Sequence, residues 1–355
     1  MLNSVSRSMA GIKPPDISKR LTHILTVVPE LTILLLFIAA AYVVMGVFSK
    51  VEGTDVMSSS SVWLVVVGSF IVSTAIAVFA VLAGIGGGVI FTPLMMGFTS
   101  IDTLVIRSTG LVVAMFSGLI STGPFMRKGL CNVKLIVYGA VPITVGAAIG
   151  ANIAIVAQES MGATGDALVR LLLGLIIAGC CVLFIKGGGK YEYPDTNRED
   201  RLGQKLGFNF SYFEESLGKD VTWQSQRVLT GGLLLLAVGF MGGFFGLGGG
   251  WALTPVLNMV MGTPLKVSAA SSGVLLAISD GTAAWKYLNY GALIAVFAAP
   301  WMLGQIVGGI IGAHALTRIR VSMIRYLIIF ILGFAAFKLV ERGIEGFTGL
   351  GIPYI

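Results

Sequence analysis

The chain has 355 residues, of which 55% are hydrophobic and only 12% are charged, and its formal net charge is +7. Because soluble domains carry about 25% charged residues, this composition excludes an ordinary soluble protein and indicates one that crosses a membrane several times. The excess Lys and Arg residues lie in the loops that flank the apolar runs, where they indicate membrane topology and not nucleic-acid binding.

Nine apolar runs along the chain are long enough for transmembrane helices. The first, 31–48, approaches the roughly 20 residues that span a bilayer. Because it is too long for the core of a signal peptide, we expect a retained helix. The other eight runs are 62–83, 103–123, 135–156, 166–185, 228–245, 267–287, 292–316 and 323–340. The predicted fold class is an all-α polytopic membrane protein with about nine transmembrane helices.

A glycine cluster occurs twice and interrupts this series at equivalent places. The first cluster is Gly84-Ile85-Gly86-Gly87-Gly88, followed by Thr92-Pro93, and the second is Gly246-Leu247-Gly248-Gly249-Gly250, followed at the same spacing by Thr254-Pro255. The apolar pieces that come next, 89–98 and 251–261, are too short to cross a bilayer unaided. We therefore expect two broken or re-entrant glycine-rich segments besides the nine helices.

The duplication extends beyond the clusters and defines two repeat halves. Ser108-Thr109-Gly110 matches Ser271-Ser272-Gly273, and Pro142, Gly146 and Gly150 match Pro300, Gly304 and Gly308 at identical spacing. The glycines of this second match fit close helix packing. The predicted organisation is an N-terminal tail with an extra transmembrane helix (1–60), a first repeat half (61–186), a cytosolic linker (187–227), a second repeat half (228–340) and a C-terminal tail (341–355).

The distribution of Lys and Arg favours inverted over parallel repeats. If the chain turns back at each cluster and the N-terminus is cytosolic, 18 of these residues lie on the cytosolic side and three lie outside, with three more at or within helices. The best-oriented parallel arrangement puts roughly 13 inside and eight outside. Since cytosolic loops carry the Lys/Arg excess, we expect an inverted repeat with a cytosolic N-terminus.

The two clusters are the best candidates for a binding site. Successive glycines break a helix, and a proline five residues later disrupts the preceding turn. Inside a membrane, freed backbone groups are tolerated only in the protein interior or in a water-filled cavity, and a helix N-terminus attracts anions. Breaks at matching places in both halves are typical of transporter binding sites. The alternative is that the glycines serve only close helix packing.

Polar and charged residues near the breaks complete the candidate site. The predicted substrate-binding residues are Gly86, Gly87, Gly88, Thr92, Arg107, Ser108, Thr109, Gly248, Gly249, Gly250, Thr254, Asn258, Ser271 and Ser272. The hydroxyls could instead bond the preceding turn of their own helix, and Arg107 could be an interfacial cation. Asp280 is the candidate carrier of a coupling ion, because a carboxylate inside a span is a functional candidate by default. Its pairing with Lys286 is the alternative.

The paired G-x-G-G-G…T-P clusters, the Ser/Thr-rich helix after each, and the G-x3-G spacing of the third helix in each half resemble the sulfite exporter TauE/SafE family over about residues 60–340. The resemblance implies a multi-pass permease of two homologous halves in a bacterial or archaeal inner membrane. It also implies a small anionic substrate, such as sulfite or an organosulfonate. The extra helix 31–48 and the central linker exceed a minimal member of that family.

The predicted function is therefore a secondary transporter that moves such an anion by alternating access, with an anion channel of the same pore as the alternative. An enzyme is not expected, because an active site needs a nucleophile–base pair or metal ligands, and the two histidines, His23 and His314, lie away from the breaks. We expect no catalytic residues, no metal and no cofactor. The expected partners are the substrate and the lipid bilayer, without nucleic acid, and the sequence leaves a homo-oligomer open.

Overall fold

The computed structural model describes residues 59–83, 86–127, 129–186, 200–214, 219–315 and 321–349. Within these ranges the chain is mostly helical, and four helices are long and apolar enough to cross a membrane. The prediction of a helical polytopic membrane protein is confirmed, whereas the number of nine transmembrane helices stays a prediction. The expected first helix, 31–48, lies outside the described residues.

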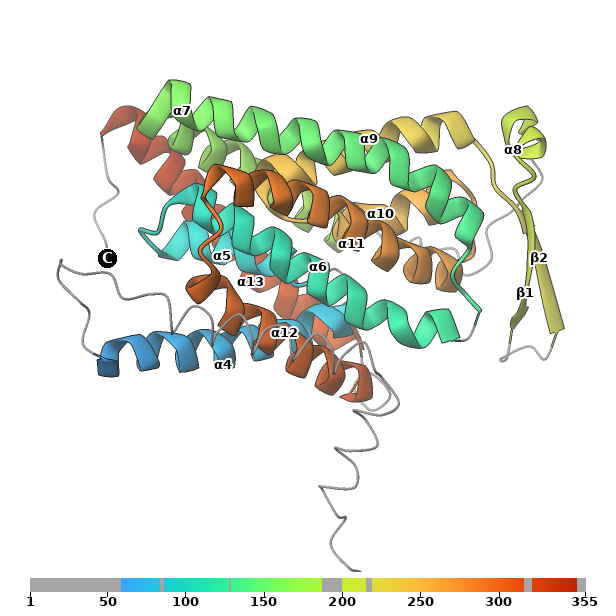
Figure 1. Ribbon diagram of the computed structural model, residues 1–355, viewed down its shortest axis with the longest axis horizontal. Helices are drawn as coiled ribbons and strands as arrows, with labels where there is room; N and C mark the ends of the chain where they lie inside the picture. The colour runs from blue at the N-terminus through green and yellow to red at the C-terminus, as the bar shows by residue number, and fades with distance from the viewer. Residues whose placement is uncertain are drawn as a thin grey trace, which may run out of the picture. The chain divides into compact units, whose positions relative to one another are not determined.

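The described elements follow the predicted order, and a β-hairpin is added in the linker (Figure 1). In chain order they are α4 (Ser59–Ala83), α5 (Gly88–Phe98), α6 (Thr103–Arg127), α7 (Val133–Lys186), α8 (Arg201–Lys205), β1 (Asn209–Glu214), β2 (Lys219–Gln224), α9 (Val228–Phe245), α10 (Gly250–Pro255), the π-helix η1 (Val256–Val260), α11 (Leu265–Tyr290), α12 (Ala295–Ala315) and α13 (Val321–Thr348). Pro255 stands at the junction of α10 and η1, where its missing N–H interrupts the α-helical hydrogen-bond pattern.

The long element α7 contains two of the predicted spans. Gly162 has φ 52° and ψ −128°, which lies outside the helical region and separates the runs 135–156 and 166–185. A positive φ is unfavourable for residues with a Cβ, so glycine suits this joint. The 54 residues of α7 are therefore two helices that meet at a kink.

One face of the first part of α7 is exposed and apolar. Val133, Val137, Val141, Val145 and Ile149 recur every four residues, and all five side chains are exposed. Residues four apart lie on the same face of a helix. A continuous apolar stripe of this length is unfavourable in water but suits contact with lipid chains, so this face of α7 points toward the bilayer.

Small residues bring α7 and α9 into close contact (Figure 1). Gly146 faces Leu236 and Phe240, and Gly150, one turn later, faces Phe240 and Phe244. Since both numbers rise together, the two helices run parallel. A Cβ at either glycine would collide with the backbone of α9, as expected for residues that permit close helix packing.

The same arrangement joins α4 to α12. Gly304 of α12 packs against the carbonyl oxygen of Phe70, and Gly308 packs against the carbonyl oxygen of Thr74. The numbers again rise together, so α4 and α12 are parallel. The third helix of each predicted half therefore packs on the helix that precedes the glycine cluster of the other half.

The helices α6 and α11, which correspond to each other in the duplicated sequence, run antiparallel. Gly118 of α6 packs against Gly273 of α11. Toward the opposite end of the pair, Ser108 Oγ donates a 3.0 Å hydrogen bond to the carbonyl oxygen of Ala292, just after α11. Equivalent segments of the two halves thus point in opposite directions.

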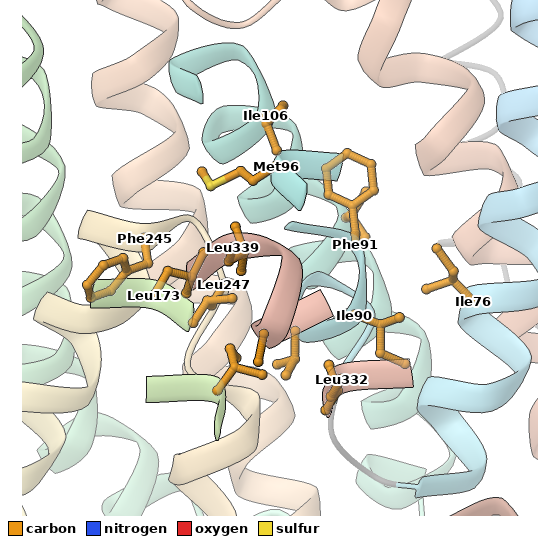
Figure 2. Close-up of a cluster of buried hydrophobic side chains, with 14 of the residues drawn as sticks. Ile76, Ile90, Phe91, Met96, Ile106, Leu173, Phe245, Leu247, Leu332 and Leu339 are labelled. Atoms are coloured by element: carbon orange, nitrogen blue, oxygen red, sulfur yellow. The ribbon is translucent and has the colours of Figure 1, made fainter. Parts of the chain in front are cut away.

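A hydrophobic cluster surrounds α5, the segment that follows the first glycine cluster (Figure 2). Its side chains come from both halves and include Ile76, Ile90, Phe91, Met96, Ile106, Leu173, Phe245, Leu247, Leu332 and Leu339. Phe91 is fully buried, and its ring meets the ring of Trp301 edge to face with centroids 4.6 Å apart. This packing holds the short segment α5 in the interior of the helical bundle.

The linker contains a hairpin that sequence analysis did not anticipate. β1 and β2 are antiparallel, with Phe210 opposite Trp223. The Trp223 side chain is buried in a cluster that includes Leu135 of α7 and Val228 of α9. The backbone N–H of Val228 also donates a 2.6 Å hydrogen bond to Asp200 Oδ2. The described part of the linker is therefore packed onto the ends of membrane helices and is more than a connector.

Candidate functional site

The second glycine cluster breaks the chain and turns it back. α9 ends at Phe245, and Gly246 and Gly248 both have a φ of 69°, a conformation that residues with a Cβ rarely adopt. At the far end of the segment α10–η1, the carbonyl oxygen of Met261 accepts a 2.8 Å hydrogen bond from the backbone N–H of Gln226, which precedes α9. The chain therefore returns to the end of α9 from which it came.

The described part of the first cluster, Gly86 to Gly88, lies against the second cluster. A Cβ at Gly88 would lie 2.7 Å from the carbonyl oxygen of Leu247. Thr92 Oγ1 donates a 2.6 Å hydrogen bond to the carbonyl oxygen of Gly246. The structure thus brings the two predicted clusters together, and their contact leaves room only for a glycine at position 88. Gly84 and Ile85 lie outside the described residues.

Each cluster has a polar side chain from the following long helix beside it. The backbone N–H of Gly87 donates a 3.3 Å hydrogen bond to Ser117 Oγ on α6. In the second half, a Cβ at Gly248 would lie 2.7 Å from Asp280 Oδ2 on α11. Since Ser117 and Asp280 are equivalent in the duplicated sequence, the two breaks have matching polar neighbours, of which one is a carboxyl group.

The Asp280 side chain is buried, with 1% of its surface exposed. Ser279 Oγ donates a 3.3 Å hydrogen bond to Oδ1, and Oδ2 has no hydrogen-bond partner among the described residues. Asp280 and Lys286 are both described, and they do not form an ion pair. The alternative that paired these two residues is therefore wrong, because six positions along a helix put them on different faces.

Most of the predicted hydroxyl and amide ligands already have partners within the protein. Ser108 Oγ donates to the carbonyl oxygens of Val105 and Ala292, Asn258 Nδ2 donates to the carbonyl oxygen of Thr263, Ser271 Oγ accepts from the backbone N–H of Asn132, and Thr254 Oγ1 lies 3.0 Å from Ser272 Oγ. Thr109 Oγ1 is buried and has no partner among the described residues. An anion would therefore have to replace existing bonds at most of these groups, but not at Thr109.

Arg107 is the largest fully buried side chain that the structure describes. Its guanidinium lies over the ring of Phe244, with its carbon atom 5.8 Å from the ring centroid, and Nη2 is 3.5 Å from Thr103 Oγ1. The backbone of Arg107 packs against Gly246 of the second cluster. Its complete burial rules out the alternative that Arg107 is an interfacial cation.

Comparisons with known proteins identify the family. The family model described as Sulfite exporter TauE/SafE matches residues 21–159 and 69–339. The chain belongs to the sulfite exporter TauE/SafE family. A relative from Bacillus subtilis (strain 168), the Probable membrane transporter protein YunE, is 23% identical over 273 residues, which are 74% of this chain and 93% of the relative. No solved structure matches significantly.

As a TauE/SafE member, the protein is a multi-pass membrane transporter and not an enzyme, as predicted. It takes a small-molecule substrate and works in a lipid environment. Among the described residues, no group of three or more His, Cys, Asp or Glu side chains is arranged to hold a metal ion.

Two further residues beside the glycine clusters were not among the predicted ligands. Ser117 could have been found from its position as the repeat equivalent of Asp280. Gln305 of α12 lies against Gly87, and its Nε2 donates a 3.2 Å hydrogen bond to Ser73 Oγ on α4. A lone glutamine in an apolar helix was the only signal for Gln305, and it did not indicate which glycine the side chain contacts.

Proposed function

We propose that this TauE/SafE protein is a secondary transporter that moves a small anion, sulfite or an organosulfonate, across the inner membrane by alternating access. The observation that carries the proposal is the contact between the two glycine clusters, in which Thr92 of one half bonds Gly246 of the other. Binding sites at the meeting point of two broken helices are typical of transporters built from repeats. Such a junction can change shape when one half moves against the other.

We propose with it an inverted repeat of residues 61–186 and 228–340, with nine transmembrane helices and a cytosolic N-terminus. The antiparallel packing of α6 and α11 supports the inversion, because parallel repeats would give these equivalent helices the same direction. The packing of helices from different halves also supports the inversion, because α4 packs against α12 and α9 packs against α7. An axis of twofold pseudosymmetry in the membrane plane relates both pairs.

The proposed substrate site lies at the two breaks. Its backbone groups come from Gly86, Gly87, Gly88, Gly248, Gly249 and Gly250, and its side-chain candidates are Thr92, Ser108, Thr109, Thr254, Asn258, Ser271 and Ser272. Arg107 is proposed as a fixed positive charge on the path of the anion to this site. Backbone N–H groups at a break bind oxyanions without a formal charge of their own. Thr109 supports this assignment most directly, because its buried hydroxyl has no partner among the described residues.

We further propose that Asp280 carries the coupling proton. The carboxyl group lies beside Gly248, inside the proposed anion site. An ionised carboxylate and an anion repel each other strongly there, since two unit charges 4 Å apart interact by about 4 kcal/mol at an effective dielectric constant of 20. Protonation of Asp280 removes this repulsion, so a bound anion and a proton are expected to move together.

Counterflow in proteoliposomes tests the proposal. Vesicles that contain the purified protein and unlabelled sulfite should accumulate external ³⁵S-sulfite transiently, whereas protein-free vesicles should not. The same assay with labelled isethionate tests an organosulfonate. A channel would dissipate the label gradient without obligatory exchange, and that result would reject alternating access while retaining anion permeation. No protein-dependent movement of either anion would reject the proposed function.

A further inference from the structure

The guanidinium of Arg107 is a buried charge without a counter-ion. Its side chain is 0% exposed, and no Asp or Glu oxygen lies within 4.0 Å of it among the described residues. Its Nε and Nη1 atoms have no hydrogen-bond partner there. Burial of an unpaired ion is costly, and ionisable groups inside a membrane protein usually mark a substrate or ion pathway.

The groups around Arg107 are neutral and already engaged. Thr103 Oγ1 faces Nη2 but donates its own hydrogen to Asp166 Oδ1. The Tyr287 hydroxyl, which lies beside the guanidinium, donates a 2.9 Å hydrogen bond to the carbonyl oxygen of Gly243. The Phe244 ring offers only a cation–π contact. These neighbours orient the guanidinium without neutralising it.

Other charged side chains from α7, α13 and the start of α6 lie around Arg107. Arg170 of α7 interacts electrostatically with Arg107, Arg342, Asp166 and Asp102, so three arginines face two aspartates. Asp102 is further committed to the start of α6, where its Oδ1 accepts a 2.8 Å hydrogen bond from the backbone N–H of Leu104. Nε of Arg170 is buried and, like that of Arg107, has no partner among the described residues.

The position of Arg107 is asymmetric between the two halves. Its repeat equivalent is Ala270, which has no charge. On α6, Arg107 lies seven residues from Ala114, which packs at Gly248 beside Asp280. Seven residues of helix correspond to about 10 Å, so the backbone of Arg107 lies about that far along α6 from Ala114.

A cavity of about 180 Å³ opens at the same end of the bundle as the start of α6. It is lined by Gly97, Phe98, Lys338, Glu341, Arg342 and Glu345. Arg342, which interacts electrostatically with Arg170, also donates a 2.5 Å hydrogen bond from Nη1 to the carbonyl oxygen of Thr99, just before α6. Arg342 therefore lines this cavity and also belongs to the charged group around Arg170 that includes Arg107.

We infer that the Arg107 guanidinium forms a second anion-binding position, distinct from the backbone N–H groups of the glycine clusters, that holds one small oxyanion such as a sulfonate or hydrogensulfite. The backbone of Arg107 packs against Gly246, so this position adjoins the second cluster. Arginine suits this ligand, because its N–H groups bond the oxygens of planar or tetrahedral oxyanions and keep their charge at all physiological pH values. The anion would enter from the cavity side and wait at Arg107 before it reaches the breaks. The role of this site in transport rests on the proposed function, whereas anion binding at Arg107 does not.

Anion-dependent thermal stability of the full-length protein in detergent tests the inference. The probes are sodium sulfite, sulfate and isethionate against a gluconate background. The unaltered protein should be stabilised by at least one of the three small anions, because a ligand that binds only the folded state stabilises it. Arg107→Gln should weaken that anion's apparent affinity by about ten- to hundredfold, the range expected for loss of a hydrogen bond to a charged group.

Two further variants separate binding from a structural role. Arg107→Lys keeps the charge and should retain weaker binding, which covers the case in which Arg107→Gln does not fold. Lys205→Gln removes an exposed cation at the end of α8 in the linker, so its anion response should match that of the unaltered protein. Without anion, Arg107→Gln should be at least as stable as the unaltered protein, because it removes an uncompensated buried charge.

Three outcomes would overturn the inference. They are an unchanged anion response in Arg107→Gln, a loss of stability in that variant with the anion response retained, and an unaltered protein that none of the three anions stabilises. Counterflow distinguishes failure of the Arg107 binding site from failure of the proposed transport function. Binding that depends on Arg107 without counterflow leaves the site intact and rejects transport, whereas counterflow that Arg107→Gln leaves unchanged rejects the site and retains transport.

Discussion

Thr92 of α5 donates a 2.6 Å hydrogen bond to the carbonyl oxygen of Gly246, which lies 154 residues further along the chain. The bond is buried and joins the segment after the first glycine cluster to the start of the second. Because Gly246 ends α9, its carbonyl oxygen is one of the groups that a helix terminus leaves without a partner in its own helix. The segment after the first break therefore satisfies a backbone group at the second break.

Thr92→Val should destabilise the protein by about 1–3 kcal/mol, the penalty for leaving a buried acceptor unsatisfied. The expected result is a lower melting temperature and weaker anion binding in a protein that still folds. Thr99→Val is the matched control, because Thr99 Oγ1 bonds only the carbonyl oxygen of Met95 one turn earlier in its own segment. Equal melting temperatures for the two variants would show that the bond between the clusters contributes nothing.

Gly88→Ala should prevent the clusters from meeting. The added Cβ would lie 2.7 Å from the Leu247 carbonyl oxygen and 2.8 Å from the carbonyl oxygen of Gly110, and overpacking of this kind destabilises by about 1–3 kcal/mol or more. Gly179→Ala in α7 is the control, since a Cβ there meets nothing within 4 Å and alanine favours a helix by about 1 kcal/mol. Melting temperature and counterflow should fall only in Gly88→Ala.

Asp280→Asn should leave anion exchange largely intact and abolish net flux driven by a pH gradient, because an amide cannot carry the coupling proton. Thr282→Val, on the same helix, removes only a hydroxyl that bonds the carbonyl oxygen of Ile278 and should change neither rate. Exchange and pH-driven flux are measured in the same vesicles. Normal pH-driven flux in a stable Asp280→Asn protein would exclude the residue from coupling.

Trp223→Ala should release the hairpin from the helices, because deletion of a buried aromatic side chain costs about 3–5 kcal/mol of packing. The reporter is Cys131, which lies with Trp223 and Phe210 around a small cavity at the hairpin. Burial raises the pKa of the Cys131 thiol, so little reactive thiolate is present at neutral pH. Release of the hairpin returns the pKa toward its usual value and should speed maleimide labelling.

In the labelling experiment, Cys180 and Cys181 are replaced by alanine so that Cys131 is the remaining thiol of the three in the chain. Cys131→Ser in that background must abolish the signal. Leu206→Ala, at an exposed side chain beside the hairpin, should leave the labelling rate unchanged. An equal rate in Trp223→Ala and its parent would mean that Trp223 does not anchor the hairpin.

Sequence alone predicted the membrane class, the family and most helices, because long apolar runs and a duplicated motif leave few alternatives. It also singled out the two clusters that the structure brings into contact, since equal spacing in both halves requires equivalent local geometry. The ligand roles stay predictions. Spacing showed that Ser108 and Asn258 are near a break, but it could not show that their polar atoms already bond Ala292 and Thr263.

The hairpin was missed although its sequence carries a signal. Phe210 and Tyr212, and then Val221 and Trp223, alternate with polar residues on either side of Gly218, a pattern typical of two strands and a turn. The balanced charges of the linker obscured this alternation. The burial of Arg107 was harder to foresee, because a cation near the start of an apolar run usually reaches the membrane surface.

The pairing of α4 with α12 has a consequence for biogenesis. Ser73 Oγ donates a 2.6 Å hydrogen bond to the carbonyl oxygen of Trp301, 228 residues later in the chain. At a synthesis rate of about 5–20 residues per second, the ribosome needs on the order of ten seconds or more to make that partner. Until then α4 resides in the bilayer without this partner for Ser73. Its retention by the insertion machinery, or by the neighbouring nascent helices, is therefore a requirement for correct assembly.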